Sequence, residues 1–168
     1  MDLHLKLLRQ FEHEAANTRK MLQRVPEEHF DWRPHAKSMT LKELAAHIAE
    51  LPRLFIAKVL TLEEFDFSKG TYRPFAGTTH QELMQFFEDN YQRSVEALSQ
   101  TTAEEIEKPW SLKSGDRTLF TMPRQAVIRN IAISHFIHHR GQLSVYLRLL
   151  DVPVPGMYGP TADEGFGG

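Results

Sequence analysis

Residues 123–150 read PRQAVIRNIAISHFIHHRGQLSVYLRLL, and this stretch decides the fold class. It predicts one helix of about 40 Å at the standard rise per residue, with Thr121 as its N-cap and Pro123 in its first turn, where proline is tolerated. Apolar side chains occupy nearly every face of this helix: Val127, Ile128, Ile131, Ile133, Phe136, Leu143, Val145 and Leu147. A helix with so little polar surface is central in its fold or partly covered by a second subunit.

Three further helices are indicated by apolar side chains that recur every three or four residues. The first of them ends before Pro26. The other two begin at capping boxes, in which a threonine and a glutamate three residues later each accept a hydrogen bond from the other's backbone amide. These boxes are Thr40 with Glu43 and Thr79 with Glu82. The chain therefore contains four long helices.

The segments between and after these helices are irregular. Pro52 lies inside the second helix, so we expect a kink near Ile48–Pro52, because proline removes a helical hydrogen bond. Residues 65–77 are expected to form a loop, and the turn at 114–116 is compatible with a small hairpin. The tail, residues 151–168, is rich in proline and glycine and is not helical. We predict an all-α four-helix bundle with a long connection after its second helix, forming a single domain over residues 1–168.

The composition narrows the classes of function. The chain has 168 residues, with 20 basic and 22 acidic side chains. This balance argues against nucleic-acid binding, which favours a basic surface. No apolar run approaches the roughly 20 residues that span a bilayer, and the first residues do not resemble a signal peptide. We therefore expect a cytoplasmic protein without a membrane anchor. There are nine histidines and no cysteine, so imidazole and carboxylate must supply the ligands of any metal site.

Two histidines of the last helix have metal-ligand spacing. His135 and His139 are four residues apart, which places both imidazoles on one helical face within reach of one ion. The position after the first histidine is Phe136, where zinc-protease helices place a catalytic glutamate, so the protease interpretation fails. His47 is the candidate third ligand because it lies on the inner side of the second helix. The alternative interpretation of His47 is a hydrogen-bonded core histidine.

Several residues near these histidines are candidates for supporting roles. Glu50 is the nearest carboxylate to His47 and a candidate proton carrier, although a solvated helix residue is the simpler interpretation. Gln142 shares the face of His135 and either lines a pocket or packs. Arg140 is interpreted as a partner in a surface or interface ion pair. Asp163 and Glu164 could fold over the site, since a flexible tail can reach back.

Four sequence blocks resemble the DinB-like proteins, also called the YfiT-type metal-dependent hydrolases. The most specific is HFIHHRGQ at 135–142, and TLKELAAH at 40–47 is similar to the family's first histidine block. WRP at 32–34 and PGMYGPTADE at 155–164 resemble two further family motifs. The resemblance implies a four-helix bundle, often dimeric, with one divalent metal ion held by three histidines. Those ligands map onto His47, His135 and His139.

Two classes of function follow. The first is an enzyme in which one divalent ion per chain activates water or a small thiol, giving a hydrolase or a low-molecular-weight-thiol S-transferase acting on a small-molecule substrate. Zinc or nickel is the expected ion, with iron and manganese as further candidates. The second is a non-catalytic dimeric bundle that acts through protein contacts, with a structural or vacant metal site. A homodimer is expected under both.

Overall fold

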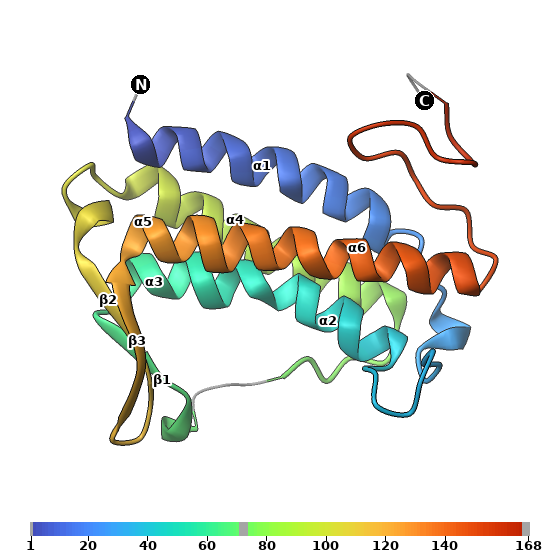
Figure 1. The fold of residues 1–168 in the computed structure, drawn as a ribbon, viewed down its shortest axis with the longest axis horizontal. Coiled ribbons are helices and arrows are strands. Elements are labelled where there is room, and N and C mark those ends of the chain that lie inside the picture. Colours follow the sequence, from blue (N-terminus) through green and yellow to red (C-terminus); the bar gives the residue numbers. More distant parts are fainter. Residues whose placement is uncertain (1, 71–73, 166–168) are drawn as a thin grey trace.

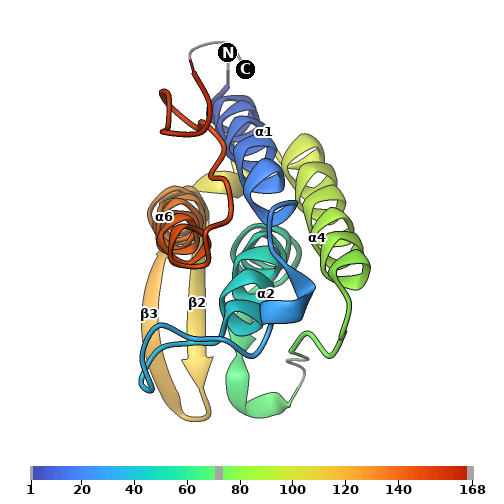
Figure 2. The ribbon, with the colours of Figure 1, turned by 90° about the vertical axis from the view of Figure 1, so that its right-hand side faces the viewer.

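Four long helices form the body of the molecule, as Figure 1 shows. The computed structural model describes residues 2–70 and 74–165. The long helices are α1 (Leu3–Leu22), α2 (Leu41–Pro52), α4 (His80–Gln100) and α6 (Ser134–Leu149). Viewed almost along their axes, the four surround one shared core (Figure 2). The largest fully buried side chains in that core include Phe11, Phe87 and Phe136.

Both predicted capping boxes are confirmed. The amide of Glu43 donates to Thr40 Oγ1 at 3.1 Å, and the amide of Thr40 donates to Glu43 Oε2 at 2.7 Å. The amides of Glu82 and Thr79 make the equivalent bonds at 3.2 and 2.9 Å. These two boxes fix where α2 and α4 begin, because each supplies partners to amides that the first turn leaves unbonded.

Two helices change their hydrogen-bond pattern along their length. Directly after Pro52, the five residues Arg53–Ala57 form a π-helical turn, and the short α3 (Lys58–Thr61) follows. The irregularity expected near Pro52 thus takes the form of a π-turn. The predicted 123–150 helix is likewise divided into α5 (Arg124–Ala126), a π-helical segment Val127–Ile133, and α6. The two π-helical segments pack against each other.

A small three-stranded sheet at one end of the bundle shows that the all-α prediction is wrong (Figure 1). Strands β2 (Pro109–Ser114) and β3 (Arg117–Pro123) form the antiparallel hairpin that the turn predicted. Gly115 in that turn has φ +62°, a conformation that favours glycine. Strand β1 (Glu64–Asp66) pairs with β2 in parallel.

Strand β1 includes the first two residues of the predicted loop at 65–77. Its pairing places Phe65 beside Leu112, and both side chains are buried. Asp66 Oδ1 accepts hydrogen bonds from the amides of Ser68 at 2.9 Å and Gly115 at 3.0 Å. Three short 3₁₀ turns complete the described structure, at Glu27–His29, Phe67–Lys69 and Glu105–Glu107.

Thr121 does not cap the last helix, contrary to prediction. It lies in β3, where its hydroxyl is 2.7 Å from the hydroxyl of Ser111 in β2. The helix begins at Arg124, whose amide donates to the carbonyl of Lys108 at 2.9 Å. Strand β3 therefore leads into α5 through Pro123, and a backbone hydrogen bond takes the place of the predicted side-chain cap.

None of the helices in the described part of the chain combines the length and the apolar character that a membrane span requires.

Candidate metal centre

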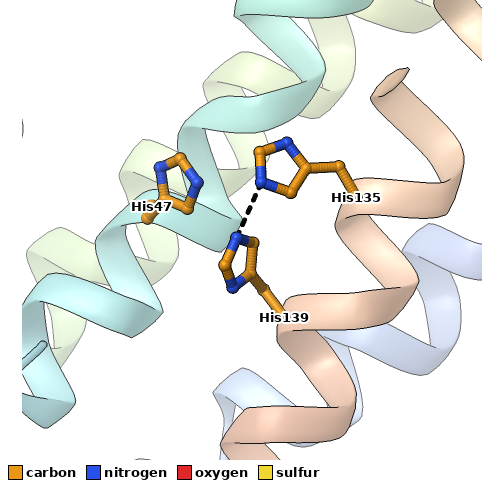
Figure 3. A group of neighbouring side chains, drawn as sticks. All are labelled: His47, His135 and His139. Atoms are coloured by element: carbon orange, nitrogen blue, oxygen red, sulfur yellow. Dashed lines mark hydrogen bonds between the residues drawn. The ribbon is translucent and has the colours of Figure 1, made fainter. Parts of the chain in front are cut away.

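Three histidines from two helices meet between α2 and α6. His47 comes from α2 and His135 and His139 come from α6, and their rings converge in Figure 3. One nitrogen from each ring lies within 4.8 Å of the other two. The Nε2 atoms of His135 and His139 are 2.7 Å apart, and the ring of His47 is centred 5.2 and 4.7 Å from those two rings. The structure thus brings together the three histidines singled out from the sequence.

The helical periodicity of α2 and α6 accounts for this convergence. His47 lies between the fully buried Leu44 and Leu51, so it is on the side of α2 that faces the core. On α6, Phe136 and Leu143 are buried, and they orient the adjacent face that carries His135 and His139. Phe55, from the π-turn after α2, contributes a ring centred 6.4 Å from the ring of His135.

Two of the histidines have a hydrogen-bond partner on the nitrogen that points away from the cluster. His47 Nδ1 is 3.3 Å from Glu50 Oε1, and His139 Nδ1 is 2.6 Å from Gln142 Oε1. Both oxygens are acceptors, so Nδ1 carries the proton in each ring and Nε2 keeps a lone pair for the cluster. Metal-binding histidines are commonly held in this way by a carboxylate or carbonyl oxygen.

These contacts revise two expectations. Glu50 is 4% exposed, so its interpretation as a solvated helix residue is wrong. Gln142 orients His139 instead of simply packing. Each partner follows its histidine by three residues, a spacing that brings side chains together on a helix. That spacing is the sequence signal that identifies both residues.

Burial and neighbouring rings disfavour the charged forms of His135 and His139. Burial, followed by the neighbouring rings of His139 and His47, lowers the pKa of His135 to about 4. Burial also lowers the pKa of His139, and its bond to Gln142 opposes this only in part. Desolvation disfavours the charged form of an imidazole, and a second imidazolium nearby would repel it. At neutral pH the rings of His135 and His139 are therefore uncharged, as a metal ligand must be.

The donor set fits a divalent metal ion. Two imidazole nitrogens at about 2.05 Å from one ion lie about 2.9 Å apart at a right angle and about 3.3 Å apart at the tetrahedral angle. The Nε2 atoms of His135 and His139 are close to this range, and side-chain rotation can bring the nitrogen of His47 nearer. Three neutral imidazoles leave coordination positions for water or another small ligand.

The side-chain carboxylates of Asp163 and Glu164 bond to groups outside the histidine cluster. Asp163 pairs with Arg148 and accepts a hydrogen bond from the amide of Val154 at 2.9 Å. Glu164 accepts hydrogen bonds from Arg24 at 3.1 Å and from the amide of Gly156 at 2.8 Å. These bonds tie both side chains to the tail itself and to Arg24 and Arg148. The tail runs near the adjoining ends of α1 and α6 (Figure 1). In this structure the tail does not use them to close the histidine cluster.

Arg140, next to His139, forms an ion pair as predicted, but the pair is buried within the chain and is not at a surface. Its guanidinium donates to Glu14 Oε2 at 2.7 Å, to the carbonyl of Glu14 at 2.9 Å and to Thr18 Oγ1 at 3.1 Å. The hydroxyl of Tyr158 in the tail donates to Glu14 Oε2 at 2.5 Å and accepts a bond from Arg140. This network joins α6, α1 and the tail, and the sequence contains no local pattern that predicts it.

Comparison with solved structures supports the fold. The DinB-like protein YjoA from Bacillus subtilis superposes with a TM-score of 0.72 at 21% identity, over 90% of this chain and 97% of that one. A DinB-like protein from Bacillus cereus ATCC 10987 superposes with a TM-score of 0.68 at 25% identity, over 90% of this chain and 95% of that one. The arrangement of helices is therefore shared with these two proteins.

Sequence comparison gives the same relationship. The chain is 27% identical to YjoA of Bacillus subtilis strain 168 over 134 residues, which are 78% of this chain and 80% of YjoA. It is 26% identical to YrdA of the same strain over 166 residues, or 94% of this chain and 89% of YrdA. The DinB family model matches residues 1–165, nearly the whole length. With the fold, the blocks around the histidines and this match in agreement, the chain belongs to the DinB family.

Proposed function

We propose that the protein binds one divalent metal ion through His47, His135 and His139 and uses it to activate a small nucleophile. The observation that carries this proposal is the convergence of three imidazole nitrogens within 4.8 Å. The bonds to Glu50 and Gln142 add support, because they direct a lone pair of His47 and of His139 into the cluster. Zinc and nickel suit this donor set best, and iron and manganese remain candidates.

A bound ion would lower the pKa of a water or thiol beside it and so produce a nucleophile at neutral pH. The chain's own residues prepare this chemistry. Glu50 and Gln142 fix ring orientation, and the buried surroundings keep His135 and His139 neutral. With water as the nucleophile the reaction is hydrolysis of a small amide or ester. With a small thiol it is transfer of the thiol to an electrophile.

The second candidate is a non-catalytic dimeric bundle, in which the histidines hold a structural ion or none. One observation favours a partner surface on α6, because Val145 and Leu149 are 56% and 58% exposed. Exposed apolar residues on one helix are suited to contact with a second subunit. We therefore keep the homodimer as part of both candidates, and sedimentation or light scattering of the purified protein measures it.

Metal content tests the first candidate directly. Protein purified without chelator and repleted with metal is expected to hold close to one ion per chain, and His135→Ala is expected to lose it. His138→Ala is the matched control, because His138 belongs to the same histidine run but lies on the exposed side of α6. Less than about a tenth of an equivalent in the repleted protein would contradict the metal site.

Catalysis needs a separate measurement. Thiols with electrophilic acceptors, tested beside amide and ester substrates, should show turnover that depends on metal and disappears in His135→Ala. Turnover that persists in a metal-free His135→Ala protein would contradict the mechanism. A fully loaded protein without turnover on any of these classes would favour the non-catalytic candidate.

A further inference from the structure

A cavity of about 310 Å³ adjoins the histidine cluster at His47. It lies between α2 and the two residues Pro74 and Phe75, which come before α4 in the chain. Its apolar lining consists of Met39, Ala46, Pro74 and Phe75. We call it the α2 cavity. Its volume is at the lower end of the range for small-molecule sites, so it suits a group the size of a short alkyl chain or a ring.

One face of α2 forms the first wall. Glu43, Ala46, His47 and Glu50 all line the cavity, and their spacing of three and four residues places them on a single helical face. The His47 side chain is 26% exposed and belongs to both the cavity and the histidine cluster. A molecule that reacts at the cluster can therefore extend into the cavity past this shared residue.

Phe75 forms the opposite wall. Its ring is centred 5.2 Å from the ring of Phe86 on α4, and the ammonium group of Lys42 lies 5.9 Å from its centre. These contacts hold an aromatic surface opposite Ala46. Apolar groups placed between them would be removed from water, which is favourable in proportion to the area buried.

The charged residues that line the cavity are acidic, and basic residues lie near it, because Lys42 contacts the Phe75 ring and Arg33 acts electrostatically on Glu43. Glu43 and Glu50 are carboxylates, and no Lys or Arg is among the described residues that line it. The amide of Thr40 donates a hydrogen bond to Glu43, which lowers the pKa of that carboxyl and keeps it ionised. A carboxylate or phosphate placed beside Glu43 would face like charge, so that position disfavours it.

Resting on the metal site proposed above, we propose that the α2 cavity binds an apolar, uncharged group of the substrate next to its reacting atom. The site then selects substrates with an alkyl or aryl group at that place and discriminates against acidic ones. The apolar walls supply the attraction, and Glu43 supplies the discrimination.

Thiol binding to cobalt-loaded protein tests this inference without relying on turnover. A thiol that binds the ion does so as the thiolate, releases its proton to the buffer and produces a sulfur-to-cobalt absorption band. We expect the affinity to rise about fourfold for each methylene added from ethanethiol to butanethiol. We expect 3-mercaptopropionate, of similar length to butanethiol but anionic, to bind at least tenfold more weakly. Equal affinities across this series, or no thiol binding, would overturn the inference.

Substitutions in the walls locate the effect. Ala46→Phe fills the cavity and is expected to weaken butanethiol binding at least tenfold with cobalt content unchanged. Ala97→Phe is the matched control, because Ala97 is also a half-buried helical alanine but lines a separate cavity with Arg53 and Lys58. Phe75→Ala removes the opposite wall without altering α2, and it should also weaken butanethiol binding. If neither wall variant changes the affinity, the cavity is not the binding site.

The discrimination against anions has its own variant. Glu43→Gln removes the charge and keeps a side chain that can complete the capping box. It is expected to strengthen 3-mercaptopropionate binding about threefold and to leave butanethiol binding unchanged. An unchanged ratio between the two thiols would contradict the role of Glu43.

These outcomes separate the two proposals. If the wild-type protein takes up no cobalt, the metal site is wrong and the cavity inference falls with it. If cobalt binds with the expected stoichiometry but thiol affinity ignores chain length, charge and the two wall substitutions, the metal site stands and the cavity inference alone is wrong.

Discussion

Removing the carboxylate of Glu14 should destabilise the protein strongly. Glu14 and Arg140 form an ion pair with side chains only 7% and 3% exposed, and Tyr158 bonds to the same carboxylate. Glu14→Ala leaves the guanidinium buried without its counter-charge. Breaking a buried pair by removing one partner costs about 3–5 kcal/mol.

The structure places the cost at the lower end of this range. Arg140 keeps three other bonds in the variant, to the backbone carbonyl of residue 14 at 2.9 Å, to Thr18 Oγ1 at 3.1 Å and to the hydroxyl of Tyr158. We therefore expect a loss of about 3 kcal/mol in the free energy of unfolding, since part of the desolvation remains compensated. In a chain of this length that corresponds to a fall in Tm of roughly 6–12 °C.

Urea unfolding of the metal-free protein, followed by circular dichroism, measures the change. At a slope of about 2 kcal/mol per molar urea, the midpoint should fall by about 1.5 M. Glu88→Ala is the control. Glu88 also pairs with an arginine, Arg19 of α1, but the side chains of Glu88 and Arg19 are 39% and 29% exposed. That variant should lose less than about 1 kcal/mol. Equal losses in the two variants would refute the reasoning from burial.

Three further outcomes are expected. Gln142→Leu should weaken metal binding about 10- to 100-fold in a competition titration, because His139 loses the acceptor that orients its ring; unchanged affinity would contradict that role. The pKa of His135 is about 4 in the folded protein, compared with an ordinary value of 6.5. Between these two pH values the unfolded chain therefore binds more protons than the folded protein. The free energy of unfolding of the metal-free protein should therefore fall as pH drops from 6.5 toward 4, and it should fall less in His135→Asn, as urea midpoints at several pH values will show. Thr40→Ala should cost about 1 kcal/mol by the same assay, because the amide of Glu43 loses its cap.

Local features of the sequence predicted much of the helical structure. A capping box involves residues only three positions apart, so Thr40 and Thr79 identified the starts of two helices. Strand β1 depends on pairing Glu64 with Ser111, which lies 47 residues later, and no local pattern specifies that partner. Threonine favours the N-cap position, which predicts a cap at Thr121, but Thr121 pairs with Ser111 of β2 instead.

The candidate site likewise has features that local spacing predicts and features that depend on the packing of distant segments. The spacing of His135 and His139 follows from helical geometry alone, whereas the approach of His47 depends on how α2 packs against α6. The orienting partners Glu50 and Gln142 lie three residues after their histidines, so helical spacing could have predicted both. The burial of Arg140 could not be predicted in this way, because its partner is 126 residues away on α1.

The π-helical segment Val127–Ile133 makes the chain sensitive to length just ahead of the histidine pair His135 and His139. Each residue of an α-helix turns the chain by about 100°, so a change in residue count that the wider π-helical turns did not absorb would move His135 and His139 to another face of α6. They would then no longer converge with His47, however well the altered helix folded. Substitutions within the segment need only preserve its apolar packing, whereas its residue count is fixed by the geometry of the site. Alignments of related chains should therefore vary in residue type across 127–133 while keeping the distance from strand β3 to the histidine pair constant.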